Sequence, residues 1–212
     1  MVSSIRRFKG IRPPPPAAGP TTVRIDGDFA DWREVQPEYR DDRGDVLHRD
    51  HRGYDNVGRY VNTTGRNDFV RLKVAADSQW VSFYARTAAP ITPPTDSRWM
   101  LLFVNADNNP VTGQEGYDYR VNHAIRSETV CVMERAGEGG TWRPVGDVEY
   151  RVAGNELEVA LPRRLLGLPA EEAVRLTFKW ADNIQRDDDV AEFTVNGDTA
   201  PNARFQYVFR SA

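Results

Sequence analysis

Short apolar or alternating runs, each ended by turn residues, recur along most of this chain and leave no room for long helices. They occupy residues 69–76, 79–87, 99–105, 117–122, 128–135, 145–162, 174–183, 190–195 and 203–209. A further alternating run, 21–27, begins the series. About ten strands spaced in this way predict an all-β fold, a two-sheet antiparallel β-sandwich of jelly-roll or immunoglobulin-like type.

Local signals add detail to this prediction. The runs VEYRV and ELEVAL meet across Gly154 and Asn155, which predicts an antiparallel hairpin. The segment RRLLG, 163–167, is the one place after the N-terminus where a helix is expected. We expect Trp32 to plug one end of the core and Cys131, which lies between two valines, to be buried.

The first twenty residues differ from the rest of the chain. Residues 1–10 have apolar side chains three apart and end at a glycine, which indicates a short helical fragment, the tail of a preceding domain. Residues 11–20 are rich in proline and indicate a stiff linker. The sandwich module is therefore expected at 21–212, with a long charged loop inserted at 37–68.

The composition of the chain limits the classes of partner that can be expected. A net charge of -3 gives no basic excess that would attract nucleic acid. No apolar run approaches the ~20 residues of a membrane helix, and the sequence has no apolar segment typical of a signal peptide. We therefore expect neither nucleic acid nor a membrane as a partner.

Catalytic motifs are not evident. His48 and His51 lie three apart, but they have no predicted helix to hold them on one face and no cysteine partner for a zinc site. No serine lies in a nucleophile-elbow context, and no glycine-rich phosphate loop joins a strand to a helix. We expect a module that is not an enzyme.

An oxygen-rich turn follows the apolar strand that ends at Val104. Its side chains include the oxygen ligands that calcium prefers. The predicted metal ligands are Asp107, Asn109, Glu115 and Asp118. The alternative is that the same residue types serve only the geometry of a hairpin turn.

Strand ends of a sandwich gather at two rims, where polar and aromatic side chains from distant segments can meet one ligand. Amides, carboxylates and arginine bind sugar hydroxyls, and aromatic rings stack on pyranose rings. The predicted ligand-binding residues are Trp142, Tyr54, Tyr60, Asp182, Asn183 and Arg66. A second polar segment, NGDTAPNAR, precedes the last strand, and solvated turns are the alternative reading for such segments.

Several of these pieces together resemble a known family. The pieces are IDGDFADW, LLFVNADNNPVTG, YDYRVN and NELEVALP, and they are similar to family 9 carbohydrate-binding modules and the wider DOMON-like sandwiches over about 21–209. The resemblance implies a two-sheet sandwich, structural calcium at the loop after Val104, and sugar binding. The chain also resembles the carboxy-terminal modules found behind glycoside-hydrolase-like domains of bacteria. This second resemblance implies an extracellular or cell-surface protein.

The chain departs from the sugar-binding members in two places. Its strand 99–105 is wholly apolar after Trp99, and the segment before the last strand has no aromatic residue until Phe205. The ligand is therefore expected at the 37–68 loop or near Trp142.

The leading hypothesis is a non-catalytic, calcium-stabilised, carbohydrate-binding accessory module of a secreted glycan-active protein. Its partners would be a polysaccharide or oligosaccharide and the upstream domain of the same polypeptide. The alternative is a structural module that packs against that upstream domain and binds no sugar.

Overall fold

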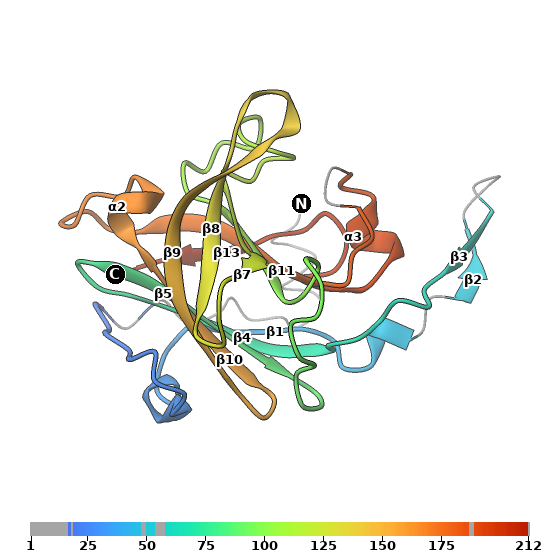
Figure 1. Ribbon diagram of the computed structural model, residues 1–212, viewed down its shortest axis with the longest axis horizontal. Coiled ribbons are helices and arrows are strands. Elements are labelled where there is room, and N and C mark those ends of the chain that lie inside the picture. Colours follow the sequence, from blue (N-terminus) through green and yellow to red (C-terminus); the bar gives the residue numbers. More distant parts are fainter. Residues whose placement is uncertain (1–16, 18, 48–49, 54–57, 187–188, 212) are drawn as a thin grey trace, which may run out of the picture.

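The computed structural model describes residues 17, 19–47, 50–53, 58–186 and 189–211, and strands dominate them (Figure 1). The strands are β1 (Glu38–Arg40), β2 (Asp50–Arg52), β3 (Arg59–Val61), β4 (Phe69–Ala76), β5 (Trp80–Thr87), β6 (Leu101–Asn105), β7 (Tyr119–Ile125), β8 (Val130–Ala136), β9 (Trp142–Ala153), β10 (Glu156–Pro162), β11 (Arg175–Asp182), β12 (Asp198–Ala200) and β13 (Tyr207–Arg210). The helical turns are the 3-10 helices η1 (Phe29–Trp32), η2 (Asp45–Leu47) and η3 (Glu138–Gly140) and the α-helices α2 (Arg163–Leu166) and α3 (Glu192–Val195).

One antiparallel sheet folds over on itself to form the body. Its strand order is β1-β4-β5-β10-β9-β8-β7-β6-β11-β12, and β13 also pairs with β11. The long strand β9 pairs with β8 from Trp142 to Glu149 and with β10 from Tyr150 to Ala153, so it belongs to both halves of the sheet. The predicted all-β, antiparallel architecture is confirmed.

The two ends of this sheet approach each other. β1 and β12 are the last strands in the order, yet the hydroxyl of Tyr39 in β1 donates to Val208 O in β13 at 2.7 Å. The Tyr207 hydroxyl donates in return to Arg40 O at 2.9 Å. Among the described residues, side-chain hydrogen bonds rather than a backbone ladder therefore join the two ends of the sheet.

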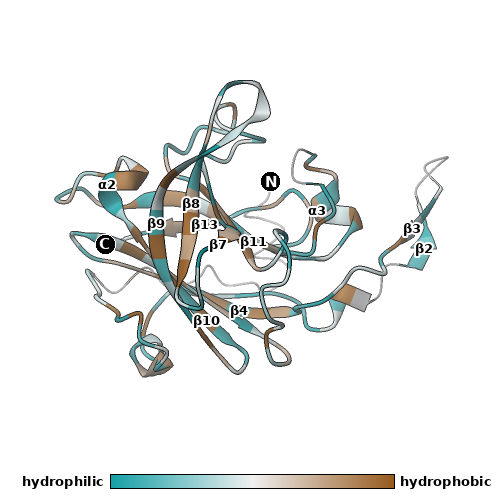
Figure 2. Ribbon diagram, in the orientation of Figure 1, coloured by the Kyte–Doolittle hydropathy of each residue, from teal (hydrophilic) through white to brown (hydrophobic). Residues whose placement is uncertain are grey.

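Apolar side chains from both halves fill the space between them. Strand alternation places Leu176, Phe178 and Trp180 on one face of β11, and all three are fully buried. Trp99 is also buried. Figure 2 shows the hydrophobic colouring along β8 and β9 within the body.

Several local predictions are confirmed. Ala153 pairs with Glu156 across Gly154 and Asn155, which is the predicted hairpin. The helical segment is α2, and Gly167 ends it in the left-handed conformation with φ 70. Cys131 is buried. Trp32 is buried as well, and its indole Nε1 donates to Glu158 Oε2 at 2.8 Å.

Two predicted strands are wrong. Residues 21–27 form no strand, because β1 occupies the edge of β4 and leaves this segment a single backbone bond, from Thr21 N to Ala76 O. Residues 192–195 form helix α3 instead. Local bonds favour this turn, since Asp189 Oδ1 accepts from Ala191 N and the Glu192 carboxylate accepts from Gln185 N.

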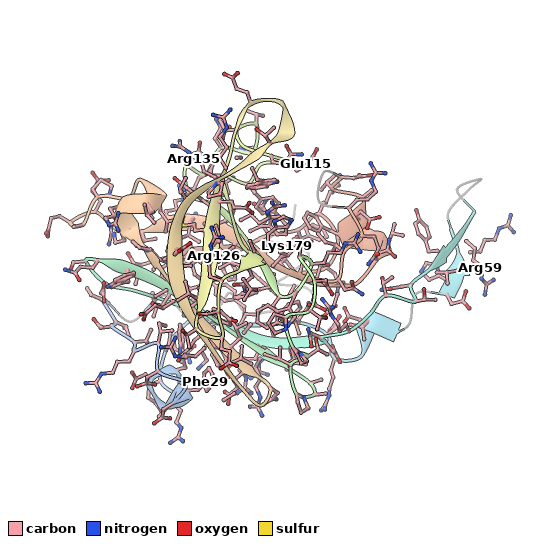
Figure 3. All side chains as sticks on the ribbon, in the orientation of Figure 1. Phe29, Arg59, Glu115, Arg126, Arg135 and Lys179 are labelled. Atoms are coloured by element: carbon pink, nitrogen blue, oxygen red, sulfur yellow. The ribbon has the colours of Figure 1, made fainter. Side chains whose placement is uncertain are left out.

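The inserted segment 37–68 is not a structureless loop. It contains β1, η2 and the hairpin β2–β3, which projects away from the body in Figure 1. Arg59 on this hairpin lies far from the core in Figure 3. The predicted helical tail at 1–10 lies outside the described residues, as does nearly all of the linker at 11–20.

Among the described residues, no helix has both the length and the apolar character needed to cross a membrane.

Candidate metal centre and ligand sites

The predicted calcium loop is held together by its own side chains. Asp118 Oδ2 accepts from Ala106 N at 2.8 Å and from Asp107 N at 3.2 Å. Asp107 Oδ1 accepts from Asn109 N, and Asp107 Oδ2 accepts from the Thr112 hydroxyl, both at 2.8 Å. The bond from Asn109 N to Asp107 Oδ1 is that of an Asx turn, and the others tie the loop to itself, which fits the alternative of a hairpin turn.

The remaining side chains of this loop point to a turn as well as to a ligand. Asn109 Oδ1 accepts from Val111 N at 3.2 Å, and Glu115 is exposed with φ 51. Asp107, Glu115 and Asp118 do not converge as a group within the described part of the chain. Calcium at this loop therefore stays a prediction without a gathered set of ligands.

A different group of acids does converge. Asp41, Asp45 and Asp198 each offer a carboxylate oxygen, and these oxygens all lie within 4.8 Å of one another. Asp41 directly follows β1, and Asp198 begins β12, so the group lies between the two edge strands of the sheet. We call these residues, together with Asp68, the acidic cluster.

Each carboxylate of the acidic cluster has one buried oxygen without a hydrogen-bond partner among the described residues. These oxygens are Asp41 Oδ2, Asp45 Oδ1, Asp68 Oδ1 and Asp198 Oδ1. Buried polar atoms in folded proteins are nearly always satisfied, so four exceptions at one place need an explanation.

The second oxygen of three of these carboxylates orients the side chain. Phe69 N donates to Asp198 Oδ2 at 2.7 Å, and Gly44 N donates to Asp68 Oδ2 at 2.9 Å. The Asn202 side-chain amide donates to Asp45 Oδ2. These bonds hold the carboxylates in place while their other oxygens remain available.

The pKa values reflect this crowding of charge. Burial and the charge of Asp45 raise the pKa of Asp41 to about 8. Burial, and then the charges of Asp45, Asp41 and Asp68, raise the pKa of Asp198 to about 8. Carboxylates that repel one another in a buried place favour protons or a bound cation.

A neighbouring lysine offsets part of this charge. Lys179 is fully buried, and its charge lowers the pKa of Asp41. Figure 3 shows it in the middle of the body. Its Nζ donates to Pro201 O and lies 5.0 Å from the Phe193 ring. Arg43 acts in the same way on Asp68, whose pKa its charge lowers. Two positive charges do not balance four carboxylates, so the cluster remains suited to a cation.

The donor set indicates which cation would fit. All its atoms are carboxylate oxygens, which suit calcium or magnesium rather than zinc. Oxygens on opposite sides of a calcium ion lie about 4.6–5.2 Å apart, since calcium–oxygen bonds are about 2.3–2.6 Å. One calcium ion can therefore contact oxygens spaced as they are here.

Arg66, Asp182 and Asn183, predicted as ligand-binding residues, are brought together at the end of β11. Asp182 is fully buried against the Arg66 guanidinium, with Nε 2.8 Å from Oδ2. Asn183 Nδ2 donates to Thr64 O at 2.7 Å. Their polar groups thus attach the inserted segment to the body, and a contact with ligand stays a prediction.

Two of the predicted aromatic ligand residues, Trp142 and Tyr60, lie on different elements, β9 and β3. Trp142 is partly buried, and Arg120 covers its ring with Cζ 4.7 Å from the centroid. Tyr60 lies on the projecting hairpin with its ring 5.7 Å from that of His51. Tyr54 lies outside the described residues.

Trp80 is the exposed tryptophan that the sequence did not single out. It is 40% exposed at the start of β5. It lines a cavity of about 660 Å³ together with Gln79, Arg164 and Leu168. An exposed indole beside a cavity is a stacking surface for a sugar ring.

No protein family model, curated protein or solved structure matches this chain. The resemblance to carbohydrate-binding modules therefore stays a prediction. The function proposed below is based mainly on the geometry of the chain itself.

The acidic cluster was missed because its members are far apart in sequence. The hydrogen bond between Asn202 and Asp45 spans 157 residues. The available signals were the repeated acids in the segment DDRGD and the polar segment NGDTAPNAR. Neither segment indicates the other as its partner.

Proposed function

We propose that this chain is a non-catalytic, carbohydrate-binding module whose β-sandwich is stabilised by one calcium ion at the acidic cluster. The observation that carries the calcium part is the set of four buried carboxylate oxygens without hydrogen-bond partners. Burying such oxygens is costly unless a cation or a proton compensates their charge.

A structural role for the ion fits the position of its ligands. Asp45 is 6% exposed and Asp198 is 0% exposed, so the ion would be largely shielded from solvent. The three converging carboxylates come from the residue that follows β1, from η2 and from β12, and Asp68 lies just before β4. An ion there would hold the inserted segment 37–68 against the C-terminal strands.

Support for sugar binding comes from Trp80 and from the family resemblance. The Trp80 ring is exposed beside Gln79 and Arg164, whose side chains can bond sugar hydroxyls. This combination of an aromatic surface and polar neighbours is what pyranose recognition requires.

Thermal melting tests the calcium part. Protein stripped with a chelator should melt at a lower temperature, and added calcium should restore the melting temperature. A ligand at ~100 times its Kd adds about 2.7 kcal/mol, which is roughly 5–10 °C for a domain of this size. Identical melting curves for stripped and calcium-loaded protein would exclude the ion.

Affinity electrophoresis in gels that contain plant or algal polysaccharides tests the sugar part. Saturable retardation supports the proposal. If a broad glycan panel gives no retardation while calcium still stabilises the protein, the alternative of a structural module that binds no sugar is favoured.

A further inference from the structure

A second cavity lies on the outer face of the sheet, beneath the segment that contains η1. Its volume is about 510 Å³, within the range of small-molecule sites. Its lining side chains come from η1, β1, β4, β5 and β10 and include Phe29, Arg33, Gln36, Glu38, Arg71, Lys73, Tyr84, Arg86 and Glu156. Figure 3 shows Phe29 at the outer side of the body, on the η1 segment.

This cavity has a rigid wall. Lys73 is buried, and its Nζ donates to Trp32 O at 2.7 Å and to Arg33 O at 3.1 Å. Glu158 Oε1 accepts from Gly27 N at 2.8 Å, and its other oxygen accepts from the Trp32 indole. Buried charged groups therefore fix the η1 segment over the sheet and keep the cavity in shape.

Two arginines lie side by side on the sheet wall of this cavity. Arg71 in β4 is the direct cross-strand neighbour of Arg86 in β5. Like charges in this arrangement are destabilising unless an anion lies between them. Arg71 has such a partner, since its Nε lies 3.2 Å from Glu38 Oε2.

Arg86 does not have such a partner. Its cross-strand neighbour on the other side is Glu156, but Glu156 Oε1 accepts the hydroxyl of Tyr84 instead. Within the described residues, the Arg86 side chain makes no hydrogen bond or ion pair, although it is half-buried and lines the cavity. Its guanidinium fork is available for a carboxylate.

We propose that this cavity binds a carboxylated sugar unit, a uronate, whose carboxylate is held by Arg86 with Arg71 beside it. This inference rests on the proposed carbohydrate-binding function. It adds a second sugar site, separate from the cavity beside Trp80, and names the class of sugar that this site takes. Gln36 and Glu156 offer partners for the ring hydroxyls, and the partly exposed Phe29 ring offers a surface for the apolar face of the pyranose.

Isothermal titration of the calcium-loaded full chain tests the inference, with trigalacturonate as the acidic probe and maltotriose as the neutral probe. Arg86→Gln removes the charge and the fork, and Arg86→Lys keeps the charge alone. Arg24→Gln is the matched control, because Arg24 is exposed and does not line the cavity.

The wild-type chain should bind trigalacturonate more tightly than maltotriose. Arg86→Gln should weaken trigalacturonate binding by about tenfold or more, which is the range for a charged hydrogen bond. The affinity of Arg86→Lys for trigalacturonate should lie between those of the wild type and Arg86→Gln. Arg24→Gln should bind trigalacturonate as tightly as the wild type does.

Equal affinity of Arg86→Gln and wild type for trigalacturonate would overturn the inference, and so would free acetate that binds as tightly as trigalacturonate. Binding of maltotriose without any preference for trigalacturonate would overturn the uronate site and leave the proposed sugar binding intact. Failure to bind any saccharide would overturn the proposed function as well.

Discussion

Arg66 holds the buried carboxylate of Asp182 with two parallel bonds, from Nε to Oδ2 at 2.8 Å and from Nη2 to Oδ1 at 3.0 Å. The same carboxylate accepts Met100 N at 2.9 Å and Asn67 N at 3.3 Å. Arg66 also reaches Asp96, with Nη1 2.5 Å from Oδ2. This pair therefore connects three segments at one end of the sandwich.

Arg66→Gln should lower the free energy of unfolding by about 3 kcal/mol, because it leaves the Asp182 charge buried without its main partner. Urea denaturation measures the change. The control is Arg59→Gln, which breaks an ion pair to Asp50 whose two side chains are 62% and 63% exposed. That variant should unfold at the wild-type urea concentration, and an equal loss in both variants would contradict a structural role of the Arg66 pair.

Asp198→Asn should abolish the calcium-dependent rise in melting temperature. Asparagine keeps an oxygen that can accept the Phe69 amide but removes the charge that calcium requires. The stabilisation lost is about 2.7 kcal/mol at calcium concentrations ~100 times the Kd. Asp107→Asn, in the loop where the sequence predicts calcium, should retain the full rise. The reverse result would place the ion in that loop.

The chelated protein should lose stability as pH rises. The pKa values of Asp41 and Asp198 are raised from 3.8 to about 8, so folding favours their protonated forms. The stability linked to those protons is fully present below about pH 4 and is lost as pH rises to about 8. Urea midpoints at pH 5.5 and 8.5 measure this slope.

Calcium should flatten or reverse that slope, because binding of the ion requires the ionised carboxylates and releases their protons. A chelated protein that is more stable at pH 8.5 than at pH 5.5 would show that these carboxyl groups do not dominate its titration.

Trp80→Ala should weaken sugar retardation by roughly 2- to 12-fold, since an aromatic contact is worth about 0.5–1.5 kcal/mol beyond its burial. Its unfolding should change little, because the ring is 40% exposed. Trp142→Ala should behave in the opposite way. It should lose about 2 kcal/mol of stability, because its ring packs near Phe103 and beneath Arg120. If Trp142→Ala weakens sugar binding and Trp80→Ala does not, the ligand site lies at Trp142, as the sequence predicts.

The strands that could be predicted are those whose pattern agrees with their surroundings. Leu176, Phe178 and Trp180 alternate in sequence and are buried together in the core. The turn at Gly154 needs φ of 60, a conformation that glycine adopts without strain. These elements could be predicted because the local conformational preference of their residues and the packing of the core favour the same structure.

Prediction failed where distant contacts or local side-chain bonds decide. The segment 190–195 alternates like a strand, but the bonds of Asp189 and Glu192 turn it into helix α3. The acidic cluster depends on the approach of β1 to β12, which no sequence spacing records. Calcium at the oxygen-rich loop after Val104 stays a prediction, since composition alone does not indicate whether oxygens converge on one point or bond their own backbone.

The position of the acidic cluster between β1 and β12 bears on aggregation. Both are edge strands of the sheet, and unpaired edges are the places where β proteins join end to end. An ion at the cluster would hold the two edges against each other and deny them to a second molecule. Withdrawal of calcium would then release these edges, and the stripped protein would be prone to self-association even while most of its strands remained paired.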